Sequence, residues 1–313
     1  RVSWLLVAGS GGAPLGGDTQ TGPADDLFAL QDRVAAGVAA ALGLATAPGA
    51  APSGPKGESA QERYLAALGH LQKYQDAASV DAAILQLEKL CAEEAAWAPA
   101  HAALARAYLA KRFLTREPVW LERAREAGLR AERIDVALLE VQLTMGRVAT
   151  ESGDPESAAA AFRKVLDRQS ADVEALLGLA DALVLAGKAG DAEGAARRAL
   201  VASPSYWAVH NKLGIVLVSS GRVEEAVAAF RRAVELAPEN ALSLVNLGSA
   251  LVLAGRLEDA SRALGRSIDV EPTAQALSAL GTVEYYRGRF DEAVTRCEEA
   301  VALLPGFSTL WVN

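Results

Sequence analysis

Hydrophobic residues recur at helical spacing through most of the chain, and the segments that carry this pattern come in pairs. Four segments align without gaps from Gly187, Gly221, Gly255 and Gly288, so their starts are 34, 34 and 33 residues apart. A second apolar segment precedes each of them, for example LVNLGSALVLAG from Leu244. Self-similarity at such a period is typical of stacked repeats, so we expect each repeat to consist of two helices and two turns.

Turn signals and small residues mark the two helices of each repeat. The glycine ends the first helix, as a left-handed terminal residue does. An acidic residue suited to the first turn of the second helix follows: Asp191, Glu224, Glu258 and Asp291. A proline then stops the second helix: Pro204, Pro238, Pro272 and Pro305. Within the second helix, an alanine and an apolar residue four positions later share one face, as Ala226 and Phe230 do.

This pattern resembles the tetratricopeptide repeat, a 34-residue helix-turn-helix unit with small residues where its helices approach most closely. Gly153, Ala158 and Phe162 extend the register back to about residue 139, and two divergent units precede it. The resemblance predicts a mostly α fold, a right-handed α-solenoid of about seven units behind a small N-terminal α/β fragment. We place the units near 62–97, 98–138, 139–172, 173–206, 207–240, 241–273 and 274–306, with the start of a further helix at 307–313.

One divergent unit, 98–138, is about seven residues too long. Aligning Ala124 and Ala131 on its second helix assigns the excess to a loop at 111–117, which carries Phe113. An aromatic residue on a loop either packs on a neighbouring element or is offered to a partner. We expect Pro118 at the first position of the following helix, where its missing N–H costs nothing.

The resemblance also implies a binding surface, because in this family the first helix of each unit lines the concave wall. The groove-lining positions are the second, fifth, sixth, ninth and twelfth of each unit. They predict a peptide or partner-binding set: Asn211, Lys212, Ile215, Val218, Leu242, Val245, Asn246, Ser249, Val252, Gln275, Ser278, Thr282 and Tyr285. The set is neutral and largely apolar, so it favours a peptide with apolar anchors.

Other members of the family clamp a C-terminal carboxylate with Lys, Arg and Asn residues at such positions. Only Asn211, Lys212 and Asn246 match that pattern here, which disfavours a carboxylate clamp. Side-chain amides offer both a donor and an acceptor, so the two asparagines are able to bind a ligand backbone. The alternative, that Asn246 hydrogen-bonds within the array, has equal weight.

The first sixty residues have a different pattern. Residues 1–7 predict a strand, residues 8–18 a turn or loop, and residues 25–44 an amphipathic helix, followed by a Pro/Gly/Ala-rich linker at 46–61. The strand, the glycine-rich turn and the helix resemble the final part of the TolB N-terminal-like α/β domain, which we assign to 1–45. Its bacterial relatives commonly follow a membrane span and belong to Ser/Thr kinases, adenylate cyclases or DNA-binding regulators.

Composition and missing motifs exclude several classes of function. The formal net charge is −8 without a block of like charge, which argues against a nucleic-acid partner. Cys91 and Cys297 are too few for a disulfide framework or a zinc site, and we expect buried thiols. No apolar run predicts a membrane span or a signal peptide. No phosphate-loop, kinase or hydrolase motif occurs, so we predict no enzyme, no catalytic residue, no cofactor and no metal site.

These observations favour a non-catalytic scaffold that binds a protein or peptide, as the sensory or assembly region of a larger bacterial signalling protein. The alternatives are the regulatory half of a kinase or adenylate cyclase, and a module that self-associates through its open ends. The chain begins at Arg1 and its only methionine is Met145, so we expect a fragment. The resemblance places it in the periplasm, in a membrane-anchored protein, with the cytoplasm as the alternative.

Overall fold

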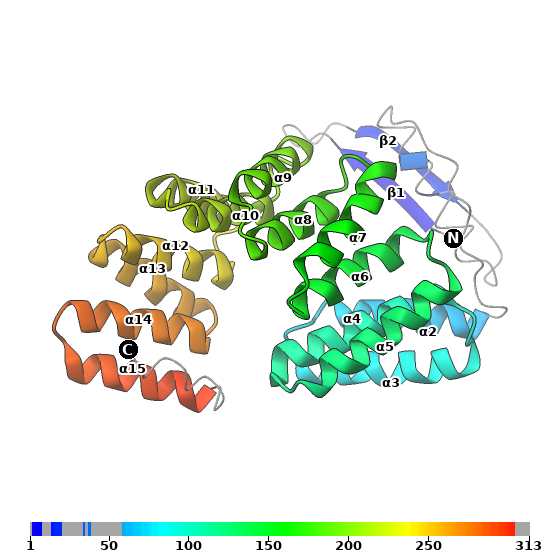
Figure 1. Ribbon diagram of the computed structural model, residues 1–313, viewed down its shortest axis with the longest axis horizontal. Coiled ribbons are helices and arrows are strands. Elements are labelled where there is room, and N and C mark those ends of the chain that lie inside the picture. The colour runs from blue at the N-terminus through cyan, green and yellow to red at the C-terminus, as the bar shows by residue number, and fades with distance from the viewer. Residues whose placement is uncertain (1, 8–13, 21–33, 35–36, 39–57, 304–313) are drawn as a thin grey trace. The chain divides into compact units, whose positions relative to one another are not determined.

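The computed structural model describes residues 2–7, 14–20, 34, 37–38 and 58–303 (Figure 1). The fold is mostly α, as the sequence predicts: residues 58–303 form fourteen helices joined by short turns. The chain divides into two compact bodies, an N-terminal body of residues 1–148 and a C-terminal body of residues 149–313. Helix α6 (Leu139–Glu151) runs from the first body into the second.

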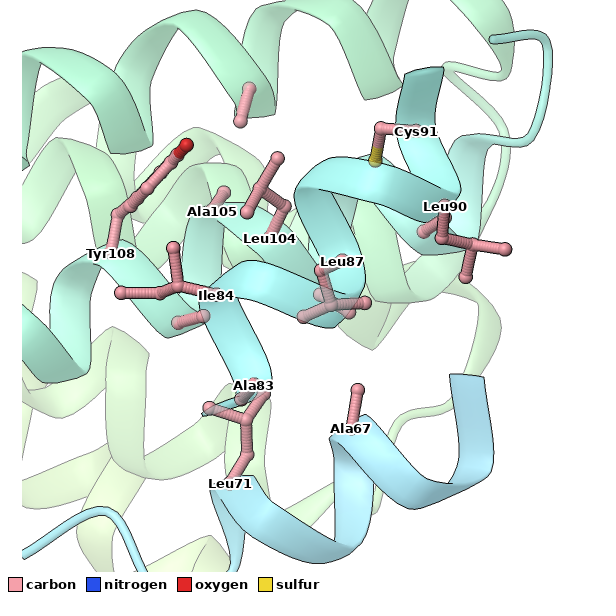
Figure 2. Close-up of a cluster of buried hydrophobic side chains, with 14 of the residues drawn as sticks. Ala67, Leu71, Ala83, Ile84, Leu87, Leu90, Cys91, Leu104, Ala105 and Tyr108 are labelled. Atoms are coloured by element: carbon pink, nitrogen blue, oxygen red, sulfur yellow. The ribbon is translucent and has the colours of Figure 1, made fainter. Parts of the chain in front are cut away.

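The N-terminal body is built on two helix pairs. They are α2 (Glu58–Leu71), α3 (Ala77–Glu93), α4 (Ala98–Thr115) and α5 (Val119–Ile134). Apolar side chains of α2, α3 and α4 converge between the helices, with Leu87 and Leu90 fully buried among them (Figure 2). Cys91 lies in this cluster, and burial raises the pKa of its thiol to about 12. Cys297 is only half-buried, so the expectation of two buried thiols is correct for Cys91 alone.

A β-hairpin lies ahead of the helices. Strand β1 (Val2–Val7) pairs antiparallel with β2 (Pro14–Gln20), with Val2 opposite Gln20. The expectation of a loop at 8–18 is therefore wrong for residues 14–18. Pairing with β1 outweighs the weak strand propensity of PLGGD, and the proline sits at the first strand position, where no ladder donor is needed.

The predicted helix at 25–44 and the linker at 46–61 lie largely outside the described residues. Of the helix, the structure describes Val34, Gly37 and Val38, and all three are helical. Helix α2 begins at Glu58, within the stretch expected to be linker.

The extra residues of the 98–138 unit do not form a loop. Helix α4 continues to Thr115, so residues 111–115 are helical, and Arg116 ends the helix with a left-handed φ of 61°. Phe113 is therefore a helix residue, half exposed, with its ring 6.1 Å from that of Tyr74 and 5.1 Å from the Arg116 guanidinium. Pro118 is the N-cap of α5, one residue before the position that we predicted.

The C-terminal body repeats one helix pair. Its helices are α7 (Pro155–Arg168), α8 (Val173–Leu185), α9 (Ala189–Ala202), α10 (Trp207–Ser219), α11 (Val223–Leu236), α12 (Ala241–Leu253), α13 (Leu257–Val270), α14 (Ala274–Tyr286) and α15 (Phe290–Leu303). Each first helix packs against the second helix of its own pair and of the preceding pair, and α8, α10, α12 and α14 also contact one another in turn. Stacking thus supplies the core that one pair cannot form by itself.

The turns form as their residues predict. The glycines that end the first helices are left-handed: Gly153, Gly187, Gly221, Gly255 and Gly288, with φ of 70° to 75°. Side chains of Asp172, Asn240 and Thr273 accept backbone N–H bonds three residues onward, which caps α8, α12 and α14. The second helices α9, α11 and α13 end two residues before Pro204, Pro238 and Pro272. Pro305 lies outside the described residues.

A second recurrent bond ties the first helix to the turn before it. The fourth residue of α4, α6 and α10 directs a side-chain nitrogen to the carbonyl six residues earlier: His101 to Ala95 (3.0 Å), Gln142 to Val136 (2.9 Å) and His210 to Pro204 (2.8 Å). A carbonyl only accepts, so Nε2 of each histidine carries the proton. His101 is buried, and burial lowers the pKa of its imidazole despite this bond.

Small residues set the distance between the two helices of a pair. A Cβ placed on Gly214 would lie 2.5 Å from the Phe230 ring, and one on Gly248 would lie 2.5 Å from Cγ of Leu264. Both distances are far below van der Waals contact, so the helix backbones approach as closely as only glycine permits.

Replacement of Gly248 by leucine should overpack this contact and lower the free energy of unfolding by roughly 1 to 3 kcal/mol. Gly265 is the matched control, because it is also helical and nothing lies within 4 Å of an added Cβ. Gly265→Ala should leave stability unchanged or raise it by up to about 1 kcal/mol. Urea unfolding followed by circular dichroism measures both variants, and equal midpoints for Gly248→Leu and the wild type would refute the packing at Gly248.

The buried His101 should make the protein less stable in mild acid. Its folded-state pKa lies below the unfolded value of about 6.5, so the unfolded chain binds the proton more readily. The stabilising contribution is full above pH 6.5 and is lost as the pH falls toward the lowered pKa. His101→Gln keeps a donor for Ala95, as Gln142 does for Val136, and should remove this part of the pH dependence of the melting temperature. The same slope between pH 7.5 and 5 in both proteins would contradict the assignment.

Candidate functional site

The predicted binding residues lie on α10, α12 and α14, the first helices of three successive pairs. Their exposure differs widely. The side chains of Asn211, Val245 and Ser278 are buried, so the prediction that they line an accessible wall needs correction. Partly exposed are Lys212, Ile215, Val218, Asn246, Ser249 and Val252, and exposed are Leu242, Gln275, Thr282 and Tyr285.

Three polar members of the predicted set, Asn211, Lys212 and Asn246, bond to one another or to a neighbouring helix. Nδ2 of Asn246 donates to Oδ1 of Asn211 at 3.0 Å, across the α10–α12 contact. The Lys212 ammonium group on α10 donates to the Asp181 carboxylate on α8. The alternative that Asn246 bonds within the array is the one that the structure shows. The three residues that match a carboxylate clamp are therefore all engaged within the protein.

Exposed apolar side chains gather instead at the C-terminal ends of the first helices. The thirteenth residue of α8, α12 and α14 is Leu185, Leu253 and Tyr286, exposed by 51%, 61% and 63%. The twelfth residue of α8, α10, α12 and α14 is also apolar. We call these side chains the apolar edge: Val184, Leu185, Val218, Val252, Leu253, Tyr285 and Tyr286.

Sequence reasoning found the twelfth position of this edge and missed the thirteenth. The sequence does contain a signal for it, because an apolar residue stands two positions before three of the turn glycines. These residues are Leu185 before Gly187, Leu253 before Gly255 and Tyr286 before Gly288. The family positions direct attention to the middle of the helix, whereas exposure is greatest in its last turn. There the next pair no longer covers the side chains.

At one end of the apolar edge, the rings of Tyr285 and Tyr286 form a cluster with the ring of Phe290. The Tyr285 ring centroid lies 5.8 Å from that of Tyr286 and 5.7 Å from that of Phe290, both in edge-to-face geometry. Phe290 is the first residue of α15 and is 60% exposed. Exposed aromatic rings of this kind are the residues that most often anchor protein partners.

Ion pairs run beside the apolar edge and link each pair of helices to the next. Arg222 reaches Glu193 of the preceding pair at 2.7 Å and Glu225 of its own pair at 2.5 Å. Arginines also link the next two pairs to the pairs before them: Arg256 reaches Glu224 at 3.9 Å, and Arg287 reaches Glu258 at 2.7 Å. Hydrogen bonds from Arg197 and Arg222 lower the pKa of Glu193.

These arginines are consequently neutralised by carboxylates that stand beside them. The edge therefore presents apolar side chains next to paired charges, and the described residues beside it include no row of unpaired cations that would attract an acidic ligand. Among residues 58–303 and the shorter described stretches, no helix is long and apolar enough to span a bilayer, and no cluster of His, Cys, Asp and Glu suits a metal ion.

Comparisons with known proteins agree with this architecture. A family model described as the tetratricopeptide repeat matches residues 143–206, 211–269 and 245–306, which together make up just over half of the chain. No curated protein matches the sequence significantly.

Solved structures of similar fold have low sequence identity to this chain, and so their likeness shows the fold alone. A tetratricopeptide repeat protein of Parabacteroides merdae is 16% identical, with a TM-score of 0.60 over 81% of this chain and 96% of that one. A thermophilic TPR protein of Thermus thermophilus is 23% identical, with a TM-score of 0.51 over 55% and 95%. PilF of Pseudomonas aeruginosa is 17% identical, with a TM-score of 0.51 over 67% and 92%. The repeated helix pairs, their left-handed glycines and the match of the family model lead to one conclusion: the chain belongs to the tetratricopeptide repeat family.

Proposed function

We propose that the protein is a non-catalytic scaffold that binds a segment of a partner protein along the apolar edge. The observation that carries the proposal is the exposure of large apolar side chains at the thirteenth position of α8, α12 and α14, whereas α10 has Ser219 there. A recurrent exposed apolar surface on a soluble framework is typical of a protein-binding site. This surface replaces the mid-helix positions as the centre of the predicted site.

The repeat geometry also limits the form of the ligand. Packed helices lie about 8–10 Å apart, and an extended chain rises about 3.3 Å per residue. A segment that crosses the first helices would therefore meet a new helix with about every third residue. We expect a ligand segment with apolar side chains at that spacing. Its other side chains should be neutral or of mixed charge, because the arginines beside the edge are already paired.

A selection from a random-peptide library with the full chain as bait tests this proposal. Selected peptides should carry apolar residues three positions apart. Leu185→Glu combined with Leu253→Glu should weaken their binding about tenfold or more, because both substitutions place charge where apolar anchors sit. Val201→Glu is the matched control, since Val201 is an exposed apolar residue on the second helix α9. Equal binding to the edge variant and to the control would exclude the apolar edge as the site.

We propose a wider context for the chain from its N-terminal segment. Residues 1–45 would be the end of a TolB N-terminal-like α/β domain, and the array would be the periplasmic sensory or assembly region of a membrane-anchored bacterial protein. Two strands alone are marginal, so the proposal requires that β1 and β2 belong to a larger sheet. The coding sequence upstream of Arg1 provides the test: further strands of such a domain after a membrane span are expected, and their absence would refute the assignment.

A further inference from the structure

The last described helix carries an apolar stripe with no helix packed over it. Phe290, Val294 and Val301 lie four and seven residues apart along α15, so they share one face, whereas Cys297 beside them packs against Gly281 of α14. Phe290 and Val294 are 60% and 44% exposed. We call Phe290, Val294 and Val301 the α15 stripe.

The equivalent stripe on α11 shows what such a surface normally contacts. Val227 and Val234 occupy the positions of Val294 and Val301, and they are only 1% and 9% exposed because α12 packs over α11. Helix α14 covers α13 in the same way. In the part of the chain that the structure describes, only α14 packs along α15. No described helix covers the side of the stripe that faces away from α14.

The charges beside the stripe indicate which charge a helix that covers α15 would carry. Glu224 of α11 and Glu258 of α13 stand at the start of their helices, and the arginine that reaches each one comes from the covering pair: Arg256 at 3.9 Å and Arg287 at 2.7 Å. Asp291 occupies the same position on α15 and makes no ion pair among the described residues. An arginine or lysine of the covering element would complete the series.

The same charges disfavour a second copy of α15 as the occupant. Asp291 and Glu298 both flank the stripe on the side away from α14, so two such faces would bring carboxylates together. A cationic partner gains from these carboxylates instead. Glu298, like Asp291, makes no ion pair among the residues that the structure describes.

We propose that the α15 stripe binds an amphipathic helix of a partner protein, with an apolar face of small and aliphatic residues and a basic residue just after its C-terminal end. This helix would cover α15 as α12 covers α11, and its basic residue would pair with Asp291 as Arg256 pairs with Glu224. The α15 stripe borders the apolar edge at the contact between the Phe290 and Tyr285 rings, but it lies on a second helix and takes a helix rather than an extended segment.

The chain itself provides a probe for this site. A synthetic peptide with the sequence of residues 241–256 contains α12 and Arg256, the element that covers α11. Its binding to the full chain is measured by fluorescence anisotropy at low salt. We expect saturable binding that Val294→Asp and Asp291→Arg each weaken about tenfold or more. Glu292→Arg makes the same charge change on the adjacent exposed residue, which is turned away from the stripe, and should leave the affinity unchanged.

Reversal of the charge on both partners distinguishes this contact from non-specific hydrophobic binding of the peptide. The peptide that carries glutamate in place of Arg256 should bind the wild type more weakly and should regain affinity for the Asp291→Arg protein. Circular dichroism of each variant shows whether it is folded, and the half-exposed positions of Asp291 and Val294 make both substitutions tolerable. Affinity that is unchanged by Val294→Asp, or a dissociation constant weaker than about 1 mM for the wild type, would overturn the proposal.

Two other occupants have their own signatures. If a second copy covers the stripe, light scattering will show a dimer of the wild-type chain that Val294→Asp converts to a monomer. If residues 304–313 of the same chain cover it, a cysteine introduced by Val294→Cys will be alkylated far more slowly than one introduced by Val201→Cys. Either result would overturn the proposal, whereas a monomer with rapid alkylation at both positions supports it.

Discussion

The structure depends on one constraint: a helix pair has more apolar surface than it can bury against itself. Helix α11 packs its small-residue face against α10 and leaves Val227 and Val234 for α12 to cover. Each pair is therefore completed by the next one, and stability resides in contacts between nearest neighbours. The close approach inside a pair, enforced at Gly214 and Gly248, is what aligns the second face for the next helix.

The same constraint decides which surfaces remain for function. Side chains near the middle of α10 and α12 are covered by neighbouring helices or bonded to them. Asn211 and Val245 are buried, and Asn246 donates a hydrogen bond to Asn211. The exposed leucines and tyrosines collect instead in the last turns of α8, α12 and α14. The ion pairs from Arg222, Arg256 and Arg287 hold successive pairs together beside this edge without leaving an unpaired charge row.

The sequence was sufficient for the features that a local pattern determines. Gly187 and Gly255 adopt the left-handed conformation that their place after an apolar helix predicts, and the prolines stop the second helices as expected. Features that depend on distant contacts were predicted less well. Strand β2 forms from a glycine-rich segment because β1 pairs with it, and Phe113 lies on a helix because α4 simply continues for five more residues than α8.

The candidate site shows the same division. Position within the repeat predicts which helix carries a residue, but not whether a neighbouring helix covers its side chain. Ser278 and Thr282 are four residues apart on α14, yet the first is buried and the second exposed. Family positions alone therefore placed the site in the middle of the helices, and the thirteenth position emerged only from the packing.

Hydrogen exchange of the full chain tests most directly the claim that each helix depends on the element that covers it. Backbone amides of α15 should exchange faster than those of α11, and the peptide of residues 241–256 should slow exchange in α15 while leaving α11 unchanged. Equal protection of α11 and α15 without the peptide would contradict the claim, because it would mean that α15 needs no covering helix.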